Sequence, residues 1–91
     1  MIKNKGISIV FFSSDNCPHC KDSELVIKTI SDVIADVSVY KIDAFKDIET
    51  SKKYSIEELP TVDIYKNGIH VDRIVGSYGQ DNLTRYIKRM V

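Results

Sequence analysis

The fold of this chain is decided by the stretch Ser13-Ser14-Asp15-Asn16-Cys17-Pro18-His19-Cys20-Lys21. This stretch contains both cysteines of the chain, separated by two residues. It follows the apolar run of residues 7–12, which is nearly continuous and predicts a buried strand covered on both faces. Pro18 favours the first position of a helix, where an N–H would have no partner within the helix. The two cysteines therefore lie at a predicted strand-to-helix turn, and we interpret them as a dithiol or disulfide redox centre.

Composition and charge predict one small globular domain that spans residues 1–91. Hydrophobic residues make up 43% of the chain, and the formal net charge is zero, which argues against a nucleic-acid partner. The apolar run of residues 7–12 is too short for a signal peptide, and no run approaches the ~20 apolar residues that a membrane span requires. We therefore expect a cytoplasmic monomer with no membrane partner. In that reducing compartment a lone Cys-x-x-Cys pair is more often catalytic or metal-binding than structural.

The pattern along the rest of the chain predicts the element order β-α-β-α-β-β-α. Apolar residues at helical spacing predict helices, apolar β-branched runs predict strands, and Asn67-Gly68 is a strong hairpin signal. The expected strands cover residues 7–12, 37–43, 59–66 and 69–75, and the expected helices cover about 19–35, 46–54 and 80–91. Ile48 and Tyr54 are expected to anchor the short second helix. With one helix expected on one face of the sheet, Asp63 and Tyr65 should lie on a half-covered face, with Asp63 in solvent.

The spacing of the cysteines gives each of them a separate role in thiol–disulfide exchange. The N-terminus of a helix favours a thiolate through its macrodipole and its backbone N–H groups, so we expect the pKa of Cys17 to fall below the ~8.5 of an ordinary thiol. A protonated His19 would lower it further. Cys20 lies one helical turn later on the same face, and from there it would resolve a mixed disulfide formed by Cys17.

Half of a zinc site is the main alternative for a bare Cys-x-x-Cys pair. Structural zinc takes four ligands, and the only other candidates are His19 and His70. His19 lies inside the loop that would wrap the metal, and His70 is expected at a surface or edge position of a hairpin strand. We therefore expect no metal within one chain. A metal bridged between two chains, or a non-catalytic, redox-regulated binding module, is the alternative to an enzyme.

Several motifs in the right order give the chain a resemblance to the thioredoxin superfamily. These are Cys17-Pro18-His19-Cys20-Lys21 after a buried strand, Leu59-Pro60-Thr61 at the start of a later strand, Lys66-Asn67-Gly68 and Gly76. The resemblance covers residues 7–91 and implies a minimal thioredoxin-like α/β fold, with a four-stranded mixed sheet flanked by helices. The chain lacks the leading strand and helix of full-length thioredoxins, so in size it is similar to glutaredoxins.

The resemblance also implies roles for individual residues, beginning with the attacking and resolving roles already given to the two cysteines. Pro60 would be a cis-proline beside the disulfide and would leave the backbone of Leu59 to pair with an extended substrate. A proline accepts the cis form at about 0.5–1 kcal/mol, whereas other residues require several times more. Thr61 continues this substrate-binding stretch. Gly76 would allow a close backbone approach near the active site, with a plain turn glycine as the alternative.

Departures from the thioredoxin pattern concern the redox centre. Asn16 stands where thioredoxins usually carry Trp, and Phe11 stands where they carry a buried Asp beneath the second cysteine. An acidic group would help to deprotonate Cys20 during resolution, whereas an apolar ring raises the pKa of Cys20 by desolvation. Lys41, the usual partner of that Asp, is then expected to reach solvent. The Pro18-His19 pair is similar to that of periplasmic disulfide-forming oxidants, but the expected cytoplasmic location favours a reductant, less reducing than ordinary thioredoxin.

The expected substrates are disulfides in proteins. Glu58-Leu59-Pro60-Thr61 and Gly76-Ser77 differ from the Thr-Val-Pro and Gly-Gly of glutathione-binding glutaredoxins. We expect a thioredoxin-like electron donor that acts in cell redox homeostasis and needs no cofactor beyond its own disulfide. A thioredoxin reductase or glutathione would recycle it, and the resemblance implies clients such as ribonucleotide reductase. A glutaredoxin-type, glutathione-dependent reductase is the alternative.

Overall fold

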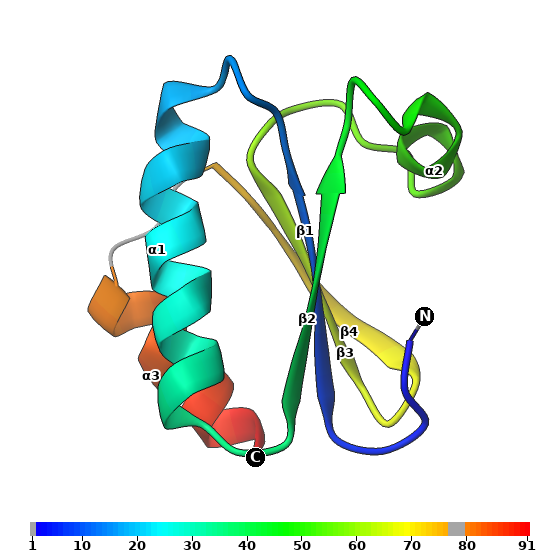
Figure 1. The fold of residues 1–91 in the computed structure, drawn as a ribbon. Coiled ribbons are helices and arrows are strands. Elements are labelled where there is room, and N and C mark those ends of the chain that lie inside the picture. The colour runs from blue at the N-terminus through cyan, green and yellow to red at the C-terminus, as the bar shows by residue number, and fades with distance from the viewer. Residues whose placement is uncertain (1, 77–79) are drawn as a thin grey trace.

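A computed structural model describes residues 2–76 and 80–91 of the chain. Its elements are β1 (Ile7–Ser13), α1 (Pro18–Val33), β2 (Val37–Asp43), α2 (Ile48–Lys53), β3 (Thr61–Lys66), β4 (Ile69–Val75) and α3 (Gln80–Met90). The strands form one sheet in the order β2-β1-β3-β4, in which β1 is parallel to β2, whereas the β1–β3 and β3–β4 pairs are antiparallel. Helices α1 and α3 lie on one side of the sheet and α2 lies on the other (Figure 1). The predicted element order and α/β fold are confirmed.

Strand β1 runs through the middle of the sheet, and all seven of its residues are buried. Its side chains alternate between two cores. Ile9 and Phe11 belong to the larger core, which α1 and α3 close, and Val10 and Phe12 belong to the smaller core on the α2 side. There the Phe12 ring packs against Tyr54, with 5.3 Å between ring centroids. Burial on both faces explains why the apolar run of this strand is nearly continuous.

Helix α1 begins at Pro18, directly after the N-cap residue Cys17, as the sequence predicts. A proline at this position removes a donor that would have had no helical partner. The buried face of the helix carries the apolar residues whose spacing predicted it, among them Ile27 and Ile30. None of the helices within residues 2–76 and 80–91 is long and apolar enough to cross a membrane.

The α2 region is shorter and less anchored than predicted. The helix starts after Asp47, whose side chain accepts a hydrogen bond from the Thr50 N–H and caps the N-terminus. The expectation that Ile48 anchors this helix is wrong, because its side chain is 54% exposed at the first helical position. Tyr54 does anchor it, through the contact with Phe12. Strand β3 begins at Thr61, two residues later than expected, since the preceding residues form a turn.

The prediction for Asp63 is wrong: this carboxylate is fully buried. Asp63 pairs with Val10 in the sheet and therefore faces the α2 side, as expected. On that side Arg73 lies directly across from it on β4, and two guanidinium nitrogens donate to its two oxygens at 2.6 and 2.8 Å. A charge-assisted pair of this geometry replaces the hydrogen bonds that the carboxylate would make to water. Tyr65, on the same side, is half-buried as predicted.

Candidate functional site

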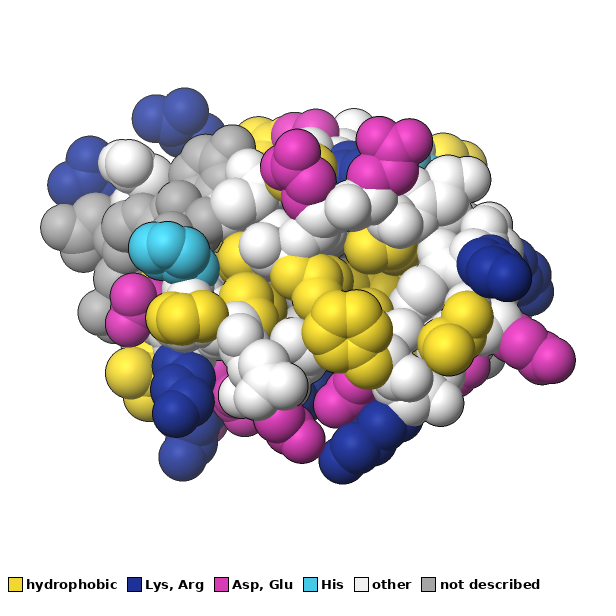
Figure 2. Space-filling model, turned by 90° about the horizontal axis from the view of Figure 1, so that it is seen from above, with side chains coloured by type: hydrophobic (Ala, Val, Ile, Leu, Met, Phe, Trp, Pro, Cys, Tyr) yellow, Lys and Arg dark blue, Asp and Glu magenta, His cyan; other side chains and the backbone are white. Residues whose placement is uncertain are grey.

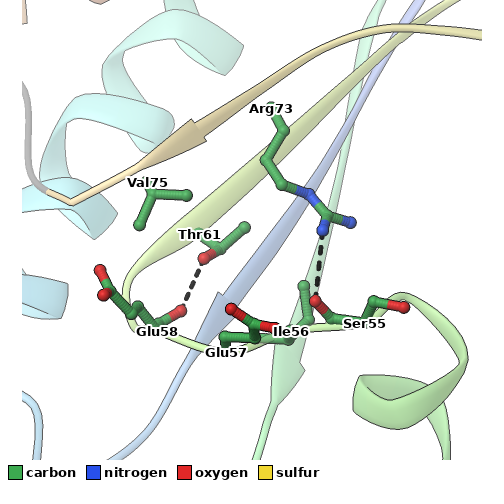
Figure 3. Close-up of a pocket in the computed structure, with 7 residues that line it drawn as sticks. All are labelled: Ser55, Ile56, Glu57, Glu58, Thr61, Arg73 and Val75. Carbon is green, nitrogen blue, oxygen red and sulfur yellow. Dashed lines mark hydrogen bonds between the residues drawn. The ribbon is translucent and has the colours of Figure 1, made fainter.

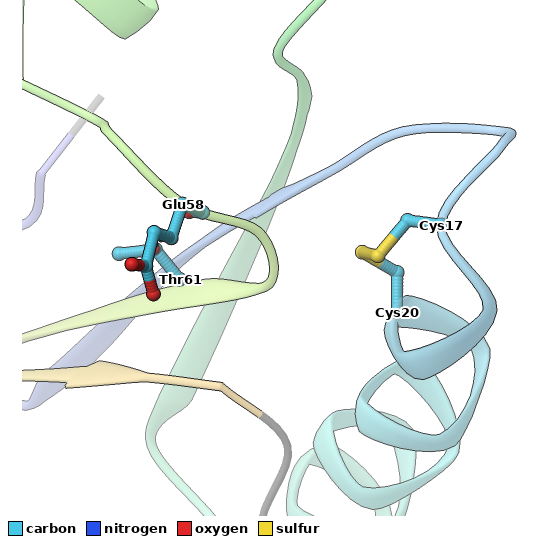
Figure 4. The surroundings of a disulfide bond; sticks show 4 residues. All are labelled: Cys17, Cys20, Glu58 and Thr61. Atoms are coloured by element: carbon cyan, nitrogen blue, oxygen red, sulfur yellow. Dashed lines mark hydrogen bonds between the residues drawn. A yellow bond between two sulfur atoms is a disulfide. The ribbon is translucent and has the colours of Figure 1, made fainter.

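The two cysteines are joined by a disulfide at the N-terminal end of α1. Their Cα atoms are 5.2 Å apart, because residues three positions apart share one face of a helical turn. The Cys20 N–H donates to the Cys17 carbonyl at 3.1 Å and closes the first turn. Figure 4 shows the disulfide beside the turn that carries Glu58 and Thr61. The motif therefore forms a compact redox pair that faces the segment before β3.

The two sulfur-bearing residues differ sharply in exposure. Cys20 is 2% exposed and belongs to the larger core, whereas Cys17 is half-buried and packs against the edge of that core. Pro18 and His19, between them, are exposed, and so is Asn16 before them. A large molecule approaching this end of the protein reaches Cys17 and not Cys20.

The floor beneath the redox centre is apolar. Phe11 is 1% exposed and lies in the same core cluster as Cys20. Lys41 pairs with Phe11 in the β1–β2 register. Lys41 reaches solvent as expected, with its side chain 51% exposed, and its ammonium also lies 2.8 Å from the equally exposed Glu24 carboxylate on α1. The carboxylate nearest this lysine thus lies at the surface and not in the core.

The segment facing the disulfide ends in the Leu59–Pro60 peptide bond, which is cis as predicted. Pro60 and Thr61 are buried, and the Thr61 hydroxyl donates to the Glu58 carbonyl at 2.6 Å. Leu59 is half-buried and contacts both cores. Of this stretch, Leu59 therefore offers the accessible side chain, while Thr61 holds the turn.

Gly76 joins this segment through its backbone, since its N–H donates to the Pro60 carbonyl at 2.9 Å. Its φ is +91°, a conformation that favours glycine, and a Cβ built at this position would meet nothing within 4 Å. The positive φ, and not a close approach of other atoms, therefore explains why a glycine stands here. This favours the interpretation of Gly76 as a plain turn glycine. Ser77, which stands in place of the second Gly of glutathione-binding glutaredoxins, lies outside the described residues.

The histidines lie on different elements, His19 on α1 and His70 on β4. His70 has its Nε2 3.5 Å from an Asp63 oxygen, and its ring meets Tyr65 edge-on at a centroid distance of 5.1 Å. In the part of the chain that the structure describes, no group of three or more His, Cys, Asp or Glu side chains is arranged to hold a metal ion.

Arg73 is a residue that the sequence reasoning did not single out. Besides Asp63, its guanidinium donates to the Tyr54 carbonyl at 2.6 Å and to the Ser55 carbonyl at 3.4 Å. The hydrogen bond to Asp63 raises the pKa of Arg73, so the guanidinium stays charged. Counting back from the Asn67-Gly68 turn would not have found the pair, because a β-bulge shifts the β3–β4 register at this point.

Comparison with known proteins agrees with this geometry. The family model described as Thioredoxin matches residues 1–89. The thioredoxin of Chlamydia trachomatis is 26% identical over 84 residues, which cover 92% of this chain and 82% of that protein. Human glutaredoxin-3 is 30% identical over 88 residues, which cover 97% of this chain and 26% of that protein.

Solved structures give the same result. A mutant thioredoxin from Halobacterium salinarum superimposes with a TM-score of 0.86 at 25% identity, covering 96% of this chain and 76% of that one. The thioredoxin of Fasciola hepatica superimposes with a TM-score of 0.82 at 28% identity, covering 96% and 82%.

Proposed function

Because the chain belongs to the thioredoxin family, we propose that its thiol–disulfide oxidoreductase activity is the reduction of disulfides in proteins by the Cys17–Cys20 pair. The observation that carries the assignment of roles is the unequal exposure of the two residues. A sulfur that a protein substrate can reach serves as the attacking nucleophile, and this is Cys17. A buried sulfur one turn away can reach Cys17 but not the substrate, and this is Cys20.

The reaction is a pair of thiol–disulfide exchanges. In the reduced protein the Cys17 thiolate, favoured by the N-terminus of α1, attacks one sulfur of the substrate disulfide, and the other substrate sulfur leaves as a thiolate. The Cys20 thiol loses its proton and its sulfur attacks Cys17, which forms the Cys17–Cys20 disulfide and releases the second substrate sulfur. Two electrons and two protons pass from the dithiol to the substrate.

The substrate-binding stretch is Leu59-Pro60-Thr61, with Gly76 behind it. Support comes from its position beside the disulfide and from the backbone hydrogen bond between Pro60 and Gly76, which ties the stretch to the end of β4. Seen from the end of the molecule above α1 and α2, hydrophobic side chains gather in the middle of the face (Figure 2). An apolar surface of this kind suits a polypeptide substrate better than a small polar one.

Recycling of the oxidised pair would use a thioredoxin-type reductase or glutathione, in the cytoplasm, with no further cofactor. Clients such as ribonucleotide reductase fit the same chemistry. Identity to human glutaredoxin-3 is the observation that favours glutathione-coupled turnover as a second candidate. Equilibration of the pair against glutathione buffers distinguishes the two, because a persistent mixed disulfide between Cys17 and glutathione indicates glutaredoxin-type chemistry. That measurement also yields the reduction potential.

Replacing each cysteine tests the assigned roles. Cys17→Ser should abolish reduction of the insulin disulfides, since the attacking sulfur is lost, and retained activity would refute the mechanism. Cys20→Ser should leave the attack intact and trap a mixed disulfide between Cys17 and the substrate. Mass spectrometry under non-reducing conditions detects that adduct, and its absence would count against Cys20 as the resolving residue.

A further inference from the structure

Asp63 and Arg73 form an ion pair that the redox reaction does not use, in which Asp63 is buried and the Arg73 side chain is 31% exposed. Asp63 has no exposed surface, and an isolated carboxylate in that position would be strongly unfavourable. Arg73 satisfies it with the planar fork of its guanidinium, through Nε at 2.6 Å and Nη2 at 2.8 Å. This bidentate geometry fixes the guanidinium rigidly against β3.

The same guanidinium reaches beyond the sheet to the segment that follows α2. Nη2 donates to the carbonyl of Tyr54, the C-cap residue of α2, and Nη1 donates to the carbonyl of Ser55. Figure 3 shows the Arg73 side chain extending from β4 toward Ser55, with a dashed line for the hydrogen bond between them. One side chain therefore joins β4, β3 and the start of the segment 54–60.

The far end of this segment is held by other polar contacts. The Thr61 hydroxyl binds the Glu58 carbonyl, and the Gly76 N–H binds the Pro60 carbonyl. Between the two ends, the segment lines a cavity of about 360 Å³ together with Arg73, Thr61 and Val75. Tyr54, Ile56 and Leu59 of the segment pack against the smaller core. Apolar contacts on one side and hydrogen bonds at the two ends therefore fix its position together.

We propose that Arg73, held by Asp63, is a positioning residue that fixes the segment 54–60 beside the Cys17–Cys20 disulfide for the binding of protein substrates. The proposal rests on the proposed function, in which Leu59 of this segment contacts the substrate. It separates two properties of the protein. Arg73 serves substrate binding, whereas the reactivity of Cys17 depends on α1 and on the core on the opposite side of the sheet.

The test compares binding with thiol reactivity in the full chain. Arg73→Gln should raise the KM for insulin reduction about fivefold, because the hydrogen bonds to Tyr54 and Ser55 are lost. The kcat and the rate of Cys17 alkylation by iodoacetamide should change by less than about twofold. Arg73→Lys should give an intermediate KM, because an ammonium keeps the charge but lacks the fork. Arg85→Gln, on the exposed face of α3, is the control for loss of a positive charge and should leave all three values unchanged.

A double variant separates positioning from stability. Asp63→Leu/Arg73→Leu replaces the ion pair with apolar side chains, which buried sites often accept without loss of stability, but it still lacks the hydrogen bonds to Tyr54 and Ser55. A raised KM in this folded variant supports positioning. A KM equal to that of the unaltered protein overturns the proposal and makes the pair purely structural, as does an alkylation rate that falls in step with kcat/KM. If the unaltered protein fails to reduce insulin, the proposed function fails, whatever Arg73 does.

Discussion

The two sides of the sheet are stabilised by different kinds of interaction. On the α1 and α3 side, apolar side chains such as Phe11, Ile30 and Ile87 close a continuous core around Cys20. On the α2 side, the smaller core is supplemented by the ion pair between buried Asp63 and partly exposed Arg73, and by a shallow cavity. Apolar packing is non-directional and fixes the depth of a side chain, whereas hydrogen bonds fix direction. The redox centre thus depends on burial, whereas the segment that faces it depends on hydrogen-bond geometry in addition to apolar packing.

Breaking the ion pair should give the largest loss of stability on the α2 side. Arg73→Leu leaves the Asp63 carboxylate buried without its bidentate partner, and we expect the free energy of unfolding to fall by about 3–5 kcal/mol. Urea denaturation at pH 7 measures this change. The double variant Asp63→Leu/Arg73→Leu should recover most of it, and an equal loss in both variants would contradict the pairing.

On the opposite side of the sheet, Phe11→Asp introduces a proton acceptor into the apolar core around Cys20. It therefore tests how far the chemistry of the redox centre depends on burial. We expect resolution of the mixed disulfide by Cys20 to accelerate about tenfold, at the low end of the roughly 10²–10⁴-fold typical of general base catalysis, because the new carboxylate must share a desolvated site. Stopped-flow measurement of substrate release reports this step. Phe11→Asn is polar but accepts no proton, so an equal acceleration in that variant would rule out base catalysis.

A hydrogen bond between α3 and β4 makes a contribution to the stability of the protein that depends on pH. The Tyr86 hydroxyl donates to the Asp72 carboxylate, and this bond, together with burial, raises the pKa of Tyr86 above its usual 10. A raised folded-state pKa means that the stabilisation is complete below the unfolded pKa and is lost as the pH rises through the folded one. Tyr86→Phe should therefore cost about 1 kcal/mol at pH 7, and the difference should shrink above pH ~10. Denaturation at both pH values checks this, with Tyr40→Phe as control; a gap that widens at high pH would contradict it.

The smallest effect is expected at the exposed ion pair beside Phe11. Glu24→Gln removes the partner of Lys41, but both side chains are half-exposed and screened by water. We expect the free energy of unfolding to change by less than about 1 kcal/mol, and the change to vanish in about 1 M salt. A loss comparable to that of Arg73→Leu would show that exposure is the wrong criterion for ranking the two pairs.

Much of the fold could be predicted because its signals are local. The apolar run of β1, the proline at the start of α1 and the Asn67-Gly68 turn each act through the conformation of a few neighbouring residues. Errors occurred where an outcome depends on distant partners. Ile48 was expected to be buried from its type alone, but the first turn of α2 leaves it at the surface.

The charged residues illustrate the same limit. A two-residue hairpin without irregularity would place Asp63 opposite Asp72, but the β-bulge near Val71 moves Arg73 into that position. Like charges opposite each other in a sheet are unfavourable, and opposite charges are favourable. The bulge, invisible in the alternation of the sequence, therefore determines that a carboxylate can be buried on this face.

The sequence by itself determined the redox turn, the order of elements and the central position of β1, because periodicity, proline and turn residues act over short ranges. Tertiary structure alone decided that Cys20 is buried while Cys17 is accessible, that Lys41 meets Glu24, and that Arg73 ties Asp63 to the segment 54–60. These features depend on register and on the packing of distant elements, which no local pattern records. The roles proposed for the cysteines and for Arg73 rest on that second group of features.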